Sequence, residues 1–171
     1  VLSVKLQNYK NYQCVLVDDM STDNSVNAIK EIIGDDKRFT LIQNTQKKYA
    51  LQNIYEAIQY SDPKNEDIIV TLDGDDWLFN RDVLKKLNQV YENNNCWITY
   101  GSYAEYPSKS RGKFSRKISE QIIYQNSFRE NEWTSSHLRS FKYFLWSNID
   151  KQDLLDSNKE FYRMAWDLSF M

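Results

Sequence analysis

Ile68-Ile-Val-Thr-Leu-Asp-Gly-Asp-Asp-Trp77 is the stretch that decides the fold of this chain. Its β-branched apolar run, 68–72, predicts a strand buried on both faces. Three carboxylates follow within four positions, Asp73, Asp75 and Asp76. Because carboxylates this close together repel one another, we expect a cation among them. Mg²⁺ or Mn²⁺ fits, since such ions bind one or two carboxylates together with the phosphates of a substrate.

Other interpretations of Asp-Gly-Asp-Asp exist. Asp and Gly are ordinary turn formers, and the last two carboxylates could simply begin a following helix. An EF-hand is excluded, because that calcium loop needs Gly at its sixth position and Glu at its twelfth. Counted from Asp73, these positions hold Leu78 and Leu84.

The surrounding chain alternates strand and helix patterns. This order predicts an α/β fold with a mostly parallel central sheet and helices on both faces. Ligands of such sheets bind at the carboxyl ends of the strands, where Asp18 and Asp19 are expected to join the three later carboxylates. Strands are expected at 12–17, 39–42, 68–72 and 96–103, and helices at 1–6, 26–33, 46–60 and 81–94.

The pattern changes after Pro107. Residues 108–117 are polar and basic, which is typical of a solvated loop, although a flexible cover that meets phosphate has the same composition. A helix is expected next, with an apolar face formed by Leu138, Phe141, Phe144 and Leu145. The chain closes with Asp167 among aromatic residues.

Composition narrows the class of protein. At 171 residues the chain is long enough for one domain, and 22 basic against 24 acidic side chains leave no basic field for nucleic acid. The apolar runs are too short for a membrane span, and no signal peptide is recognisable. Two isolated cysteines, Cys14 and Cys96, favour a reduced, cytoplasmic protein. A start at Val1 and an end inside a helical pattern predict a piece of a longer protein.

Two motifs resemble those of family 2 glycosyltransferases with the GT-A fold. Val15-Leu-Val-Asp-Asp-Met-Ser-Thr-Asp-Asn-Ser25 is similar to their Val-Asp-Asp-x-Ser-x-Asp segment, and Leu72-Asp-Gly-Asp-Asp-Trp77 to their Asp-x-Asp motif. Two motifs in the right order are more specific than either one alone. The resemblance implies a single Rossmann-like GT-A domain over 1–171, with a nucleotide-sugar half at 1–106 and an acceptor-side half at 107–171.

Relatives in this family begin with a strand that ends in Pro-x-Tyr-Asn or a similar sequence and forms one wall of the nucleotide pocket. That strand would precede the 1–6 helix, and the sequence does not contain it. The resemblance therefore implies a domain truncated at both ends, with weakened donor binding.

The resemblance also implies roles for individual residues on the donor side. Asp18 or Asp19, with Asp19 preferred, would accept a hydrogen bond from the base of a nucleotide diphosphate sugar. Lys48 stands where many relatives place a basic residue near the base or phosphate.

Around the metal, the resemblance assigns three neighbouring carboxylates. Asp75 would bind Mn²⁺ or Mg²⁺. Asp73 would share the metal and contact the ribose or sugar, and Asp76 would support the metal or touch the donor sugar.

Three residues of the second half complete the implied site. Asp167 stands where such enzymes keep their general base, although a structural acid at a helix N-terminus would look the same. His137 and Arg139 fall in the part of the fold that faces the acceptor or the diphosphate. A structural hydrogen bond at a helix start remains the alternative for His137.

The implied reaction is transfer of a sugar from a nucleotide diphosphate sugar, expected to be a UDP-sugar, to an acceptor hydroxyl with inversion and a divalent metal. The acceptor, whether glycan, protein or lipid, is left open. Two rival functions also remain: a non-catalytic nucleotide- or sugar-binding module, and a sugar nucleotidyltransferase that likewise holds metal at a strand end.

Overall fold

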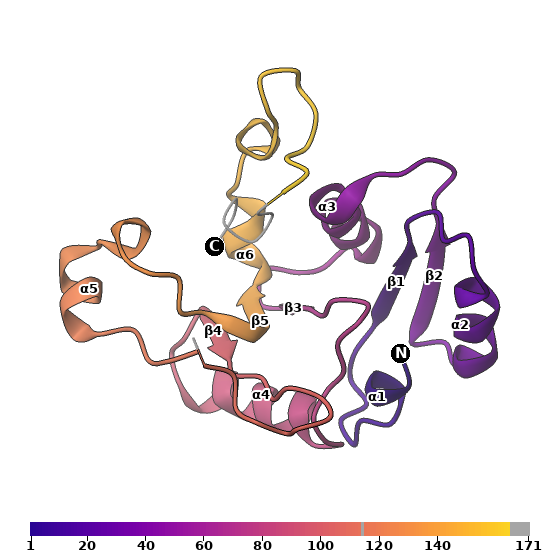
Figure 1. Cartoon of the computed structure of the whole chain (residues 1–171), viewed down its shortest axis with the longest axis horizontal. Coiled ribbons are helices and arrows are strands. Elements are labelled where there is room, and N and C mark those ends of the chain that lie inside the picture. Colours follow the sequence, from indigo (N-terminus) through magenta and orange to yellow (C-terminus); the bar gives the residue numbers. More distant parts are fainter. Residues whose placement is uncertain (114, 165–171) are drawn as a thin grey trace.

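Two small β-sheets form the frame of the chain, seen in a computed structural model that describes residues 1–113 and 115–164 (Figure 1). In the first sheet, β1 (Cys14–Asp18) runs parallel to β2 (Phe39–Gln43). In the second, β5 (Ser136–Lys142) lies between β3 (Ile68–Thr71) and β4 (Ile98–Gly101), antiparallel to both.

The expected single, mostly parallel sheet is therefore wrong for the described residues. The four predicted strands are all present, but only β1 and β2 pair in parallel. The place between β3 and β4 is taken by β5, which comes from the segment where a helix was predicted.

Tertiary packing explains why this segment is a strand despite its helical spacing of apolar residues. Ser140 is fully buried, and its hydroxyl oxygen lies 2.9 Å from the Tyr91 hydroxyl and 2.6 Å from Thr99 Oγ1. The next residue, Phe141, is 2% exposed and belongs to the core. Both faces of the strand thus make tertiary contacts, and these contacts outweigh the local helical propensity of the segment. The end of the predicted helix survives as α6 (Tyr143–Ser147).

The four helices predicted in the first half are present. They are α1 (Leu2–Lys5), α2 (Ser25–Ile33), α3 (Tyr49–Ser61) and α4 (Val83–Asn93). Gly34, with φ of 54°, follows the last residue of α2, and Asp62 in the left-handed conformation follows α3 just before Pro63. Both ends agree with their sequence signals.

The core lies where α3 meets the second sheet. Leu51 and Ile58 of α3 pack with Phe141, Trp146 and Leu154. Tyr91 of α4 reaches the neighbouring residue of β5, and adjacent strand residues face opposite sides of a sheet. Helices α3 and α4 therefore cover opposite faces of this sheet, as expected for an α/β fold.

The remaining elements lie in the second half of the chain. They are α5 (Glu120–Gln125) and two 3₁₀ turns, η1 (Phe128–Glu130) and η2 (Lys151–Leu154). In Figure 1, α5 lies at the outer edge of the molecule, far from the first sheet. None of the helices in the described ranges has the length and apolarity that a bilayer crossing requires.

Both cysteines are free thiols, as the sequence predicted. Cys14 begins β1, and burial raises its pKa to about 11. Such a thiol behaves as a small apolar side chain.

Candidate functional site

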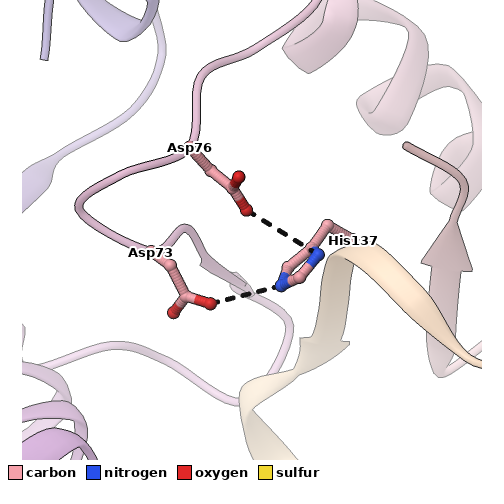
Figure 2. Close-up of side chains that lie close together, drawn as sticks. All are labelled: Asp73, Asp76 and His137. Atoms are coloured by element: carbon pink, nitrogen blue, oxygen red, sulfur yellow. Dashed lines mark hydrogen bonds and ion pairs between the residues drawn. The ribbon is translucent and has the colours of Figure 1, made fainter. Parts of the chain in front are cut away.

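Asp73, Asp76 and His137 converge at the end of β3 (Figure 2). One possible ligand atom from each residue lies within 4.8 Å of the others. His137 Nε2 is 3.2 Å from Asp73 Oδ2, and His137 Nδ1 is 3.7 Å from Asp76 Oδ2. Each carboxylate faces a different nitrogen of the imidazole ring, as Figure 2 shows.

The strand pairing brings these residues together. Thr71 on β3 lies opposite Arg139 on β5, and continuing this antiparallel register by two residues places Asp73 opposite His137. The turn that follows β3 then returns Asp76 to the ring, and its backbone N–H donates to the Asp73 carbonyl over 3.1 Å.

Gly101 on β4 permits this arrangement from the other side. A Cβ atom at this position would lie 2.6 Å from the His137 carbonyl oxygen and 2.7 Å from the Leu138 nitrogen. Both are backbone atoms that cannot rotate away, so the strand carrying His137 can approach β4 this closely only at a glycine.

The three side chains fit a divalent metal. Two carboxylates and an imidazole supply oxygen and nitrogen donors, and side-chain exposures of 32% to 43% leave the group open to a ligand. The imidazole nitrogen departs from the all-oxygen coordination that is typical of Mg²⁺. Without a metal, the same geometry allows hydrogen bonding between the imidazole and the carboxylates, which becomes an ion pair only if His137 is protonated.

The structure places Asp75 apart from this cluster. Asp75 is exposed and is not among the converging ligand atoms. With Asp76 it lines an open cavity of about 520 Å³ between α1 and the turn at 73–77, which we call the acidic turn. Trp77 lines the same cavity and contacts Tyr106 edge to face, with ring centroids 5.3 Å apart. The carboxylate that joins Asp73 in the described cluster is therefore Asp76.

Asp19 is held by backbone and amide donors at the start of α3. Its Oδ1 accepts from the Lys48 N–H at 2.8 Å and from Asn44 Nδ2 at 2.9 Å, and its Oδ2 accepts from the Tyr49 N–H at 2.9 Å. Burial raises the pKa of Asp19, but these hydrogen bonds outweigh it and the net pKa is lowered. Both oxygens of Asp19 thus serve to anchor the loop before α3.

Asp18 is the more deeply buried of the two neighbours, at 7% exposure. Its Oδ2 accepts from the Ser21 N–H at 3.3 Å, which is a long and weak contact. Asp18 therefore keeps more free acceptor capacity than Asp19, the residue that the family resemblance favours.

Lys48 directs its side chain to α3. Its Nζ donates to Glu56 Oε2 over 2.7 Å, in a pair whose side chains are 22% and 39% exposed. Burial raises the pKa of Glu56, while hydrogen bonds from Lys48 and Gln52 lower it more, so the net pKa is lowered. The ammonium group predicted to meet a base or phosphate is paired with a carboxylate here.

Arg139 lies two residues after His137 on β5 and is 6% exposed. Its guanidinium carbon lies 5.9 Å from the centre of the Trp133 ring, a cation–π contact. Asp167, the expected general base, lies outside the described residues.

Comparison with known proteins decides the family. The family described as Glycosyl transferase family 2 matches residues 1–154. The chain belongs to this family. The resemblance seen in the two sequence motifs is thus confirmed, and family membership implies the Rossmann-like GT-A fold.

A curated relative of this family 2 chain is an uncharacterized glycosyltransferase from Haemophilus influenzae. The two are 36% identical over 170 residues, which cover 94% of this chain and 65% of the relative. The chain thus spans just under two thirds of that protein's length.

All three residues of the cluster were predicted site residues, but His137 was expected on the acceptor or diphosphate side. The contact between His137 and Asp73 was not predicted, because a helix was expected over 138–145. Had that segment been treated as a strand antiparallel to 68–72, the pairing of His137 with Asp73 would have been within reach.

Proposed function

We propose that this family 2 chain transfers a sugar from a UDP-sugar to an acceptor hydroxyl, with inversion and with Mn²⁺ at Asp73, Asp76 and His137. The observation that carries the proposal is the convergence of these three side chains at the end of β3. Strand ends are where α/β sheets bind their ligands.

The chemistry of sugar transfer needs such a group. Departure of the sugar leaves a diphosphate with growing negative charge, and a metal held by these residues would neutralise that charge. Asp73 and Asp76 supply the anionic ligands, and His137 supplies a neutral one when it is unprotonated. The partial exposure of all three leaves room for phosphate oxygens beside them.

In this proposal Asp18 accepts a hydrogen bond from the nucleotide base. Both oxygens of Asp19 are already used at the start of α3, whereas within the described residues the Asp18 carboxylate accepts one long hydrogen bond, from Ser21. Asp19 then acts indirectly, by fixing the loop that carries Lys48.

Asp167 is proposed as the general base, on the strength of the family resemblance. Its carboxylate would take the proton of the acceptor hydroxyl as the acceptor oxygen bonds to the anomeric carbon. The bond to the diphosphate breaks on the opposite face, so the configuration inverts. Because the two faces of the sugar differ, the base must come from a segment other than the acidic turn.

The test is a screen of UDP-sugars for UDP release with Mn²⁺ and with chelator. Metal-dependent UDP release that is lost in Asp73→Asn, and inverted product by NMR, are the expected results. Asp167→Asn is expected to retain UDP binding while its turnover falls by about a hundredfold or more.

The rival functions give different products in the same screen. A sugar nucleotidyltransferase would release pyrophosphate from UTP and a sugar phosphate. A binding module would bind UDP-sugar with no release of UDP. Either outcome would overturn the proposed transfer.

A further inference from the structure

Gln7, two residues after the end of α1 at Lys5, is fully buried at 0% exposure although its side chain is polar. The sequence gives no sign of this, because it lies in a polar run, 7–11. A buried amide is costly unless its donors and acceptor are satisfied. The Gln7 amide is hydrogen-bonded chiefly by the segment at 78–84, which follows the acidic turn.

Two of the three hydrogen bonds of the Gln7 side chain reach that segment, one at Asn80 and one at Leu84. Nε2 donates to the Asn80 carbonyl over 2.6 Å, and Oε1 accepts from the Leu84 N–H over 3.1 Å. Nε2 also donates to the Ser3 carbonyl over 3.0 Å, which ties the amide to α1. One side chain thus links α1, the loop and the first turn of α4.

Neighbouring residues extend the connection along the same loop. Ser3 Oγ accepts from the Leu78 N–H over 3.1 Å, two residues after Asp76. The Asn8 N–H donates to the Arg81 carbonyl over 2.7 Å. We call Ser3, Gln7 and Asn8 the N-terminal clamp.

The clamp affects the site through the backbone of the acidic turn, which sets where the Asp76 carboxylate lies. The Asp76 carboxylate is 43% exposed and lies 3.7 Å from His137, so its position depends on the backbone that enters and leaves the turn. Strand β3 fixes the entry through its pairing with β5, and the clamp fixes the exit. A turn held at both ends presents its carboxylates in one arrangement.

We propose that Gln7 is a positioning residue for the acidic turn, holding the loop at 78–84 so that Asp76 stays beside His137. This proposal rests on the proposed function, in which that group binds Mn²⁺. Gln7 itself touches neither the metal nor the donor. Its effect passes through Asn80 and Leu84 to the turn.

The test compares Gln7→Met with the core variant Ile58→Val by calorimetric titration of Mn²⁺ and by amide hydrogen exchange. Met preserves most of the side-chain volume but offers neither donor nor acceptor to Asn80 and Leu84. Ile58 belongs to the α3 core, so its variant reports loss of stability without a change in the clamp. Ser3→Ala, a milder change, serves if Gln7→Met fails to fold.

The expected result is a loss of Mn²⁺ affinity of about tenfold in Gln7→Met, the effect typical of residues that orient metal ligands. Ile58→Val should retain wild-type affinity even where its melting temperature falls as far. Unchanged Mn²⁺ affinity in both Gln7→Met and Ser3→Ala overturns the proposal.

Hydrogen exchange separates this inference from the proposed function. If the wild-type protein binds no Mn²⁺, the metal site is wrong, and the clamp is judged by exchange at the Leu78 and Leu84 amides. Faster exchange at these amides in Gln7→Met alone supports a clamp on the loop. Equal exchange in wild type and Gln7→Met shows that Gln7 does not hold it.

Discussion

His137 Nε2 lies 3.2 Å from Asp73 Oδ2, although 64 positions of sequence separate the two residues. The contact exists because β5 returns antiparallel beside β3. The acidic turn of the first half therefore receives its third member from the second half of the chain, and the site forms only when the two halves fold together.

Replacing His137 with Phe tests whether the ring belongs to the metal group. Phe keeps a planar ring but removes both nitrogens, so we expect Mn²⁺ affinity to fall about tenfold, or by about 1.4 kcal/mol. Calorimetric titration measures the affinity, and circular dichroism checks the fold. Wild-type Mn²⁺ affinity in this variant would show that His137 is not a metal ligand and only contacts the two carboxylates structurally.

Replacing Gly101 with Ala tests the close approach of β4 to His137. The added Cβ would meet backbone atoms at 2.6 and 2.7 Å, so the strands must separate, at a cost of about 1–3 kcal/mol in the free energy of unfolding. We also expect weaker Mn²⁺ binding, because His137 moves with its strand.

Gly74→Ala is the matched control for Gly101→Ala, since a Cβ at Gly74 meets nothing within 4 Å. Urea unfolding should show little change for this variant. If Gly101→Ala is as stable as Gly74→Ala, the contact with His137 is not as tight as described.

The sequence predicted the local elements well and the sheet poorly, for a physical reason. Residues 26–33 and 68–72 show clear helical or strand patterns, and Gly34 marks a helix end, because these signals come from neighbours in the chain. The strand at 136–142 has no such signal. Its Ser140 is stabilised by hydroxyl groups of Tyr91 and Thr99, which are distant in sequence.

The same distinction explains the candidate site. The carboxylates after residue 72 are visible as a motif, but which of them faces His137 depends on how the turn folds. Asp76 rather than Asp75 does so in the described structure. The burial of Gln7 likewise depends on a loop more than seventy positions away.

Asp19→Asn tests the anchor at the start of α3. The amide group of Asn brings donors toward the N–H groups of Lys48 and Tyr49, so we expect a loss of about 2 kcal/mol in the free energy of unfolding at pH 7. Urea unfolding measures the loss. An unchanged midpoint would show that these hydrogen bonds contribute little.

The difference in stability between wild type and Asp19→Asn depends on pH in a direction that the pKa of Asp19 sets. The folded pKa of Asp19 lies below its ordinary value of 3.8, so its stabilisation is fully present above 3.8 and is lost as pH falls through the folded pKa. The stability gap between wild type and Asp19→Asn should therefore narrow below pH 3.8. A gap that stays constant to lower pH contradicts the assigned shift.

Lys48→Met and Glu56→Gln together separate two roles of Lys48. If Lys48 serves only its ion pair with Glu56, both variants should lose less than about 1 kcal/mol of stability and bind UDP equally well. If the ammonium group also reaches the donor, as the family resemblance implies, only Lys48→Met should weaken UDP binding. Calorimetry with UDP and Mn²⁺ distinguishes the two results.

The most direct measurement is calorimetric titration of UDP with Mn²⁺ into wild type, Asp76→Asn and Asp75→Asn, each repeated with chelator. We expect UDP binding that the chelator abolishes, a loss of affinity of about tenfold or more in Asp76→Asn, and a smaller loss in Asp75→Asn. A larger loss of UDP affinity in Asp75→Asn would indicate that Asp75, the residue suggested by the sequence motif, binds the metal. Folded wild-type protein that binds no UDP with Mn²⁺ would contradict the proposed site.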